Sequence, residues 1–281
     1  MPEAMRLAGR PVADAVLTEV SAEVASMGKP PALVFVRVGE DPASASYVTS
    51  KERAARRTGI EAHTVVMPET ATQAAVEGVL TGLSSDDAVD GILLQLPLPA
   101  GLDADAAIAC ISPLKDVDGL GTLSVGRLWN GTEGLFPCTA LGLIRMLDHY
   151  GIGIEGREVV IVGRSALVGK PAAALFLRRN ATVTVAHSRT RELGDVTRRA
   201  DILVAAVGVP GLIRAAMVRP GAVVLDVGLT RVEGTIRGDV DPEVGGVASA
   251  LTPMPGGTGL MTVAMLLANT VQAARARRGP G

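Results

Sequence analysis

The first side chains that could do chemistry are a tyrosine and a lysine four residues apart, Tyr47 and Lys51. In a helix, residues at this spacing are neighbours on one face. The chain holds four lysines beside 23 arginines, so a lysine at this position is informative. A buried lysine can lose its proton and act as an acid or base, which arginine cannot. The alternative is a surface lysine that lies near a tyrosine by chance.

Polar residues near the end of an apolar strand supply further candidates. Gln95 lies at the carboxyl end of a strand expected over residues 90–96, and ligands bind at such ends in open parallel sheets. Asp116 and Asp118 lie in the turn over residues 113–119. These two carboxylates are candidates for a chemical site, although Asp116 could instead cap its own turn.

A glycine-bearing turn follows a second apolar strand. The strand over residues 159–162 runs directly into Gly163, and Gly169 comes shortly before Pro171, which suits the first turn of a helix. Such a turn presents backbone N–H groups and a helix N-terminus to a phosphate. Because the spacing differs from G-x-G-x-x-G, an ordinary loop between a strand and a helix is the alternative.

The residues after the next strand indicate which dinucleotide binds. In an NAD site this strand usually ends on a carboxylate that accepts a hydrogen bond from the ribose 2′-hydroxyl. Here Ala186 leads into residues 187–191, which hold hydroxyls and arginines but no carboxylate before Glu192. Such donors suit a 2′-phosphate. NADP is therefore predicted, with Arg164 and Ser188 as the first candidates to contact it, and a solvated basic turn is the alternative.

Apolar runs of strand length alternate with segments of helical period, which predicts an α/β fold with parallel strands. Residues 113–137 are expected to form an ordered loop, Thr139 to cap a helix, and the tail from Arg275 to fray. The other expected helices span residues 12–27, 72–83 and 260–275, and the other expected strands span residues 32–36, 64–67, 182–186, 202–207 and 222–227.

The helix that carries Tyr47 and Lys51 has clear boundary signals. Asp41 is expected to cap its N-terminus, with Pro42 in the first helical position. Gly59 stands where a glycine ends many helices.

Composition excludes several classes of protein. The chain has 281 residues, six of them aromatic, and a formal net charge of -2, whereas nucleic-acid-binding domains are usually basic or offer rings for base stacking. No apolar run has the length of a membrane helix, and Asp14 and Glu19 interrupt any secretory signal. Two cysteines and three scattered histidines lack metal-ligand spacing, so no metal is predicted.

Taken together, these segments resemble the bifunctional methylenetetrahydrofolate dehydrogenase/cyclohydrolase family. The matches follow the family's order, and their combination is specific although each motif is short. They lie at residues 47–51, 94–99, 115–119, 137–139, 163–165, 168–169 and 255–257.

The resemblance implies two α/β domains that flank a cleft. Residues 1–138 would form a folate-binding catalytic domain, with the C-terminal helix 262–281 packed back on it. Residues 139–261 would form a Rossmann-like NADP-binding domain with a parallel sheet. In the shared cleft, methylenetetrahydrofolate would give a hydride to NADP, and water would open the methenyl product to 10-formyltetrahydrofolate. The resemblance also implies a cytoplasmic homodimer that serves one-carbon metabolism and purine biosynthesis.

The same resemblance assigns roles to residues. Lys51 would be the central catalytic residue, Gln95 would hold and tune it, Tyr47 would stack on the aminobenzoyl ring of folate, and Asp118 would bond the pterin. The substrate site would be completed by Leu94, Leu96, Pro255, Gly256 and Gly257. The cofactor site would comprise Gly163, Arg164, Ser165, Gly169, Ser188 and Leu229.

Several positions depart from the family's usual pattern, and they bear on substrate affinity and on the balance of the two activities. Alanine replaces proline at position 140, and position 124 holds serine where asparagine is familiar. The glycine-rich turn has Thr258 and Leu260 for valine and proline, and residues 229–230 are Leu-Thr instead of Ile-Asn.

Two other hypotheses remain at this point. The chain could be an NADP-dependent dehydrogenase whose cyclohydrolase activity is weakened or lost, or one that acts on a different one-carbon carrier. It could also be a non-catalytic paralogue that binds folate or NADP. The presence of Tyr47, Lys51, Gln95 and Asp118 counts against the paralogue, because a binding module needs no lysine tuned for acid–base work.

Overall fold

The computed structural model describes residues 4–232 and 234–279. The chain divides into two compact units. Unit 1 comprises residues 1–14 and 139–262, and unit 2 comprises residues 15–138 and 263–281. Helices α1 (Gly9–Ala25) and α9 (Gly259–Arg278) each contribute residues to both units.

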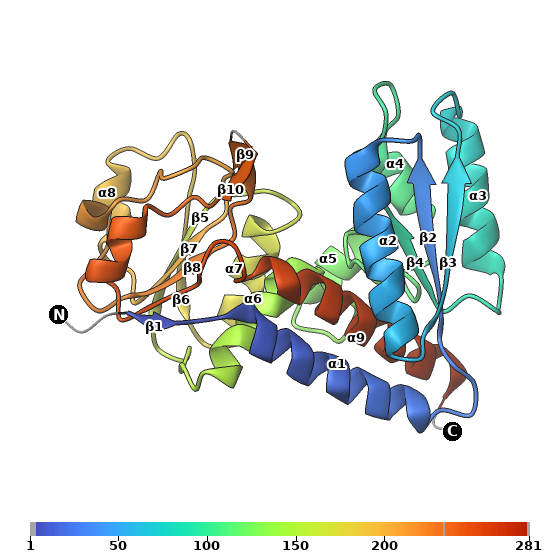
Figure 1. The fold of residues 1–281 in the computed structure, drawn as a ribbon, viewed down its shortest axis with the longest axis horizontal. Coiled ribbons are helices and arrows are strands. Elements are labelled where there is room, and N and C mark those ends of the chain that lie inside the picture. The colour runs from blue at the N-terminus through green and yellow to red at the C-terminus, as the bar shows by residue number, and fades with distance from the viewer. Residues whose placement is uncertain (1–3, 233, 280–281) are drawn as a thin grey trace. The chain divides into compact units, whose positions relative to one another are not determined.

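Unit 2 is built on parallel strands in the order β3-β2-β4, with β2 at Ala32–Val38, β3 at Glu61–Met67 and β4 at Gly91–Leu94. The chain steps from β2 to one neighbour and then across to the other. Right-handed crossovers therefore place α2 (Pro42–Arg57) and α3 (Gln73–Ser85) on opposite faces of the sheet (Figure 1). Alternate residues of β2 and β4 pack with α3 and α4 (Ala104–Ala109) in one apolar cluster.

Helix α2 has the predicted boundaries. The Asp41 carboxylate accepts a hydrogen bond from the Ser44 N–H at 2.7 Å, and Pro42 occupies the first position. Gly59 follows the last turn with a φ of +85°, a conformation that suits glycine. This cap fixes where the helix begins, and therefore which face carries Lys51.

Two sequence predictions about residues 113–139 are wrong. The expected loop contains α5 (Thr122–Trp129), whose buried Ser124 is bonded to a carboxylate outside the helix. Helix α6 (Cys138–His149) begins at Cys138, so Thr139 lies inside its first turn. The Thr139 hydroxyl is hydrogen-bonded to that of Thr262 at 3.0 Å instead of capping the helix. In both places tertiary contacts override the local signal.

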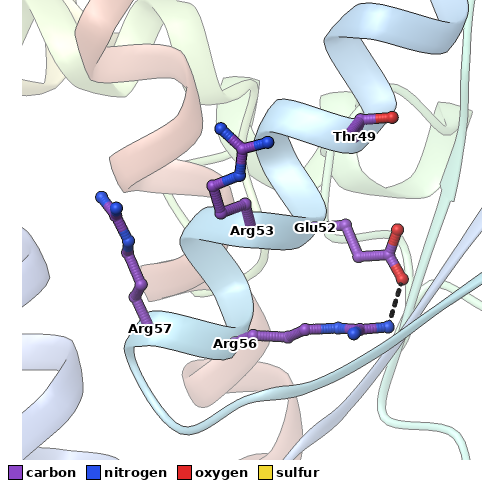
Figure 2. Close-up of a pocket in the computed structure, with 5 residues that line it drawn as sticks. All are labelled: Thr49, Glu52, Arg53, Arg56 and Arg57. Carbon is purple, nitrogen blue, oxygen red and sulfur yellow. Dashed lines mark hydrogen bonds and ion pairs between the residues drawn. The ribbon is translucent and has the colours of Figure 1, made fainter.

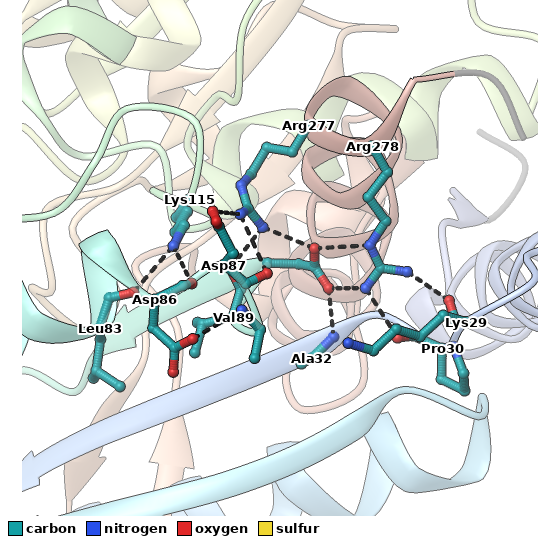
Figure 3. Close-up of polar contacts among 12 residues, drawn as sticks. Lys29, Pro30, Ala32, Leu83, Asp86, Asp87, Val89, Lys115, Arg277 and Arg278 are labelled. Carbon is teal, nitrogen blue, oxygen red and sulfur yellow. Dashed lines mark hydrogen bonds and ion pairs between the residues drawn. The ribbon is translucent and has the colours of Figure 1, made fainter.

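The expected fraying from Arg275 is also wrong for the residues that the structure describes, because α9 continues to Arg278. Figure 3 shows Arg277 and Arg278 side by side at the end of this helix. Asp90, which is fully buried, binds both arginines. Arg277 Nη1 lies 2.9 Å from the carboxylate. Arg278 Nη1 also donates to the Lys29 carbonyl at 2.6 Å. A buried carboxylate with two guanidinium partners holds the helix end in place.

Unit 1 is built on a parallel sheet whose order, over the described residues, is β1-β11-β8-β7-β5-β6 (Figure 1). These strands span Met5–Arg6, Ala250–Leu251, Val223–Asp226, Ile202–Ala205, Glu158–Val162 and Thr182–Ala186. Every pairing in this sheet is parallel. The predicted fold class, with α/β architecture and a Rossmann-like parallel sheet, is confirmed.

Strand order reverses around β5, and this reversal marks where a ligand binds. From β5 the chain passes through α7 (Gly169–Arg178) to β6 on one side, then through α8 (Leu193–Thr197) back across β5 to β7. Open α/β sheets bind ligands at the carboxyl ends of the strands where the order reverses. The remaining elements are the 3-10 turns Ala215–Met217 and Pro242–Gly246 and the antiparallel hairpin of β9 (Thr230–Val232) and β10 (Thr235–Arg237).

Among the helices of the described residues, none is both long enough and apolar enough to cross a membrane.

Candidate active site

A lysine and a glutamine from different elements meet in unit 2. Lys51 lies in α2 and Gln95 directly after β4, and Lys51 Nζ donates a hydrogen bond to Gln95 Oε1 at 3.0 Å. The glutamine is itself fixed, because its backbone N–H donates to the Val36 carbonyl at 2.8 Å and its Nε2 donates to the Leu96 carbonyl at 2.6 Å. The amide oxygen is therefore presented to the lysine.

Strand register brings Asp118 to the same place. Ile92 of β4 forms a parallel bridge with Asp116, and the Ile92 N–H donates to the Lys115 carbonyl at 2.8 Å. Extended by two residues, this register places Asp118 level with Leu94, the last residue of β4 and the residue before Gln95. The charge interaction between Lys51 and Asp118 agrees with this placement. The structure thus brings together Lys51, Gln95 and Asp118.

Burial shifts the pKa of Lys51 down and the pKa of Asp118 up, so it favours the neutral form of each side chain. The pKa of Lys51 lies below its ordinary value of 10.5 because burial disfavours the ammonium, although the charge of Asp118 acts in the opposite direction. The pKa of Asp118 lies above its ordinary value of 3.8, mainly because of burial, and the Lys51 charge opposes that shift. A lysine with a lowered pKa is suited to accept a proton.

Asp116 shapes the loop that carries Asp118. Its carboxylate accepts hydrogen bonds from the N–H groups of Gly119 at 3.1 Å and Gly121 at 2.8 Å, and from the Ser124 hydroxyl at 2.7 Å. The alternative that Asp116 caps its own turn is therefore confirmed. Serine at position 124, one of the departures from the family pattern, completes this cap.

Cys138 and Asn269 contact the segment that carries Asp118. The buried Cys138 thiol is hydrogen-bonded to Asp118, and its Sγ lies 3.3 Å from the Val117 carbonyl. Asn269 of α9 donates to the carbonyls of Val117 at 2.8 Å and Phe136 at 2.9 Å. Burial raises the pKa of Cys138 well above its ordinary value of 9.0, so the thiol stays protonated.

The remaining predicted substrate residues of unit 2 lie around this group. Tyr47 is one turn before Lys51 in α2, with 52% of its surface exposed. Leu94 ends β4 and is buried, whereas Leu96 is half-buried. An exposed ring beside a polar group is available to a flat ligand.

A pocket on α2 is separate from the group formed by Lys51, Gln95 and Asp118. Figure 2 shows its lining, with Arg56 turned toward Glu52 at 2.7 Å and with Arg53 and Arg57 directed elsewhere. Helical geometry places Thr49, Arg53 and Arg56 on the face of α2 away from Tyr47 and Lys51. This pocket therefore has no part in the Lys51 site.

The predicted cofactor loop lies at the strand reversal in unit 1. Gly163 follows β5 with a φ of +132°, and a Cβ there would overlap the Ala206 carbonyl oxygen. A Cβ on Gly169 would overlap the Gly163 carbonyl in turn. Both glycines are needed for the chain to turn this tightly into α7. The turn leaves Arg164 and Ser165 exposed.

The other predicted cofactor residues occupy neighbouring strand ends. Ser188 is exposed in the turn after β6, and Leu229 is half exposed after β8. Ser165 Oγ accepts a hydrogen bond from the Val168 N–H at 3.1 Å, so it supports the start of α7. A tight glycine turn, a helix N-terminus and an exposed arginine fit a dinucleotide phosphate.

Pro255, Gly256 and Gly257 lie in unit 1, between β11 and α9. The Gly9 N–H donates to the Gly256 carbonyl at 2.8 Å, and Gly256 has a φ of +100°. The structure brings together the first group of predicted substrate residues in unit 2 and places this turn in the other unit.

Family models match both parts of the chain. A model of the tetrahydrofolate dehydrogenase/cyclohydrolase catalytic domain matches residues 7–118, and a model of the NAD(P)-binding domain of the same family matches residues 137–278. The chain belongs to this family.

Individual relatives agree over nearly the whole length. The "Bifunctional protein FolD" of Thermus thermophilus is 54% identical over 272 residues, covering 97% of this chain and 96% of the relative. The crystal structure of the bifunctional enzyme FolD from Campylobacter jejuni is 41% identical with a TM-score of 0.95, covering 98% of this chain and 99% of that one. A Trypanosoma brucei structure, 38% identical with a TM-score of 0.92, is a complex with NADP cofactor and inhibitor, and it covers 99% and 100% of the two chains.

These findings confirm that the chain is an enzyme of folate chemistry with dehydrogenase and cyclohydrolase activities and a nicotinamide cofactor. They also confirm the family named from the sequence motifs. The predicted residue roles and domain limits stay predictions.

Sequence reasoning missed four residues that shape the two sites: Cys138, Asn269, Asp226 and Asp239. Cys138 has the residue type of a small buried core residue, although it lies in the segment 137–139 that matches the family. The two aspartates lie in the segments Asp-Val-Gly and Gly-Asp-Val-Asp. A charged residue at the end of an apolar strand was the signal that could have found Asp226, whereas Asp239 follows the short polar strand β10 and has no such signal.

Proposed function

We propose that Lys51, positioned by Gln95, is the residue on which the family's folate chemistry depends in this chain. The observation that carries the proposal is the 3.0 Å hydrogen bond from Lys51 Nζ to Gln95 Oε1, in surroundings that lower the lysine pKa. Gln95 Oε1 accepts this hydrogen bond and so orients the amine. Its neutral side chain also leaves the lysine free to lose its charge.

Lys51 serves as proton acceptor in the hydrolytic reaction. The oxygen of water bonds to the methenyl carbon, and one of its protons passes to Lys51 Nζ. The second water proton then passes from the new hydroxyl to N5 as the bond from this carbon to N5 breaks, and the oxygen becomes the formyl carbonyl of 10-formyltetrahydrofolate. The positive charge of the methenyl substrate adds to burial in lowering the lysine pKa.

Substrate is held by groups around Lys51. Asp118 bonds the pterin, and its loop is fixed by Asp116 and by Cys138. Tyr47 stacks on the aminobenzoyl ring. Leu94 and Leu96 line the folate site of unit 2, and the family resemblance also gives residues 255–257 of unit 1 a part in substrate binding.

The cofactor is NADP, bound at the strand reversal in unit 1. When bound, NADP supplies the hydride acceptor for oxidation of the methylene carbon. The binding set is Gly163, Arg164, Ser165, Gly169, Ser188 and Leu229. Arg164 and Ser188 favour NADP over NAD because the turn after β6 offers donors and no carboxylate to a 2′-phosphate.

The test follows both steps with methylenetetrahydrofolate and NADP in a Lys51→Met variant, with Lys29→Met as the control because Lys29 is exposed. Loss of the base lowers the cyclohydrolase rate by roughly 10²- to 10⁴-fold. An unchanged rate would remove Lys51 from the mechanism. Wild-type protein that forms methenyl product without hydrolysing it would be a monofunctional dehydrogenase, and no turnover would indicate a paralogue that only binds.

The assembly and location of the enzyme rest on the family resemblance. The chain forms a homodimer in the cytoplasm. Size-exclusion chromatography with light scattering checks the dimer, and a mass of one chain, 28.8 kDa, would contradict it.

A further inference from the structure

Two buried carboxylates lie at the carboxyl edge of the unit 1 sheet, in neither of the predicted sites. Asp226 ends β8, and Asp239 comes two residues after β10. Their exposed fractions are 2% and 0%. Buried carboxylates need hydrogen-bond donors, and the donors that these two find are backbone N–H groups.

Asp239 holds the loop that follows β7. Its carboxylate accepts hydrogen bonds from the N–H groups of Val207 at 2.6 Å, Gly208 at 3.1 Å and Val209 at 2.7 Å. Hydrogen bonds to an ionised acceptor are stronger than neutral ones. Three successive amides on one carboxylate fix the course of residues 207–209.

Asp226 holds the base of the β9–β10 hairpin and so places Asp239. It accepts from the N–H groups of Gly228 at 3.0 Å, Asp239 at 3.0 Å and Val240 at 3.1 Å. The Thr258 hydroxyl donates to the Asp226 carbonyl at 2.9 Å. Threonine at 258, a departure from the family's valine, therefore adds an anchor to this aspartate.

The two carboxylates are interlocked with two glycines. A Cβ on Gly228 would overlap the Asp239 carboxylate, and a Cβ on Gly238 would overlap that of Asp226. Neither glycine has a positive φ, so it is the close approach of the carboxylate, and not the backbone conformation, that excludes a side chain.

The loop held by Asp239 borders the predicted cofactor turn. Ala206 donates its N–H to the Val162 carbonyl at 2.8 Å, and its own carbonyl is the atom that a Cβ on Gly163 would overlap. Thr230 Oγ1 donates to the Gly208 carbonyl at 3.1 Å. Residues 206–209 thus lie between the glycine turn and the hairpin, at the strand reversal where the dinucleotide binds.

We propose that Asp239, placed by Asp226, is a positioning residue for NADP: it holds residues 207–209 in the shape that the bound cofactor requires. The proposal rests on the assignment of the cofactor site to this strand reversal. It separates the two activities, because the hydrolytic step depends on Lys51 in unit 2 and needs no dinucleotide.

The experiment compares Asp239→Asn and Gly228→Ala with Gly245→Ala, whose added Cβ meets nothing within 4 Å. Asparagine turns one acceptor into a donor facing amides, and Gly228→Ala displaces the carboxylate without changing its charge. NADP affinity is measured by calorimetry, the cyclohydrolase reaction is assayed with methenyltetrahydrofolate, and hydrogen exchange of residues 207–209 is followed by mass spectrometry.

Both variants are expected to weaken NADP binding by roughly 10- to 100-fold and to speed exchange of residues 207–209. Cyclohydrolase kcat/KM stays within about twofold of wild type, since the variants leave the Lys51 site intact, and Gly245→Ala matches wild type in every assay. Equal loss of both activities would show a general structural role and overturn the proposal, as would unchanged NADP affinity.

The same assays separate this proposal from the cofactor assignment on which it rests. Wild-type protein that fails to bind NADP would overturn both. Wild-type binding with unchanged affinity in Gly228→Ala would overturn the role of Asp239 alone, including the case in which Asp239→Asn does not fold.

Discussion

Each unit contains a pair of aspartates near the carboxyl end of a parallel strand of its sheet, and the partners of the two pairs differ. In unit 2, Asp116 accepts backbone amides while Asp118 faces the Lys51 ammonium and the Cys138 thiol. In unit 1, Asp239 and Asp226 both accept backbone amides. Aspartate therefore fixes a loop through backbone hydrogen bonds in both units, but only in unit 2 does an aspartate of the pair also have ionisable side chains as partners.

This difference indicates which unit carries the hydrolytic reaction and which one binds the cofactor. Proton transfer needs a group whose charge can change, and Lys51 beside Asp118 provides it. A carboxylate whose lone pairs are taken by amides fixes geometry, which is what hydride transfer to a bound dinucleotide requires. Unit 2 is therefore expected to carry the hydrolytic chemistry, and unit 1 to present the cofactor.

A third aspartate, Asp90, sharpens the comparison because its partners are arginines. Asp90→Ala leaves Arg277 and Arg278 without their buried partner, so the free energy of unfolding should fall by about 3–5 kcal/mol. The control Asp87→Ala removes an exposed partner of Arg277 and should cost less than about 1 kcal/mol. Urea denaturation measures both, and equal effects would contradict the account of the α9 anchor.

The pair in unit 1 predicts a pH dependence of stability. Burial raises the pKa of Asp226 from 3.8 to about 6, although backbone amides oppose the shift. Because the folded state holds this proton more tightly, the stabilisation is full below the ordinary pKa and is lost as pH rises through about 6. The wild type should therefore lose about 3 kcal/mol relative to Asp226→Asn between about pH 4 and about pH 7. Thermal unfolding of both proteins across this range checks it, and a constant difference would contradict it.

Gln95 tests whether the lysine of unit 2 must be held. Gln95→Leu removes the acceptor of Lys51 Nζ and should lower the cyclohydrolase rate by roughly 10²-fold. NADP affinity should not change. Gln272→Leu, which loses an exposed bond to the Gly134 carbonyl, is the control. A rate equal to that of wild type would show that Lys51 needs no positioning.

Asp116 should affect folate binding in the way that Asp239 affects NADP binding. Asp116→Asn weakens the cap around Gly119, Gly121 and Ser124 and should raise KM for folate by roughly tenfold. NADP affinity should stay unchanged, in contrast to Asp239→Asn. Steady-state kinetics with each substrate varied in turn decides this, and a matching loss of NADP affinity would break the comparison.

Local signals predicted much of the fold. Asp41, Pro42 and Gly59 gave the limits of α2, and apolar runs located β2, β3 and β4 in one sheet and β5 to β8 in the other, but not the two-residue strands β1 and β11. Helix α5 and the ordered end of α9 could not be found this way. Helix α5 depends on Asp116, which lies outside the helix. The ordered end of α9 depends on Asp90, which lies far from it in sequence.

The site was predictable where residue types are unusual for their surroundings. Lys51, Gln95 and Asp118 stood out in apolar or arginine-rich contexts, and the structure brings them together. Cys138 and Asn269 could not be distinguished from core residues by type, because only the folded chain shows the Val117 carbonyl that both contact. Three departures from the family pattern, Ser124, Thr230 and Thr258, each make a hydrogen bond that supports a site loop.

The most direct test is the pKa of Lys51, measured by NMR on protein labelled at the lysine side chains. With four lysines in the chain, a Lys51→Arg variant assigns the signal by its disappearance. The account predicts titration below the ordinary value of 10.5, and a return toward that value when burial is reduced by Leu94→Ala. Titration of Lys51 at or above 10.5 would contradict the claim that this lysine is prepared to accept a proton.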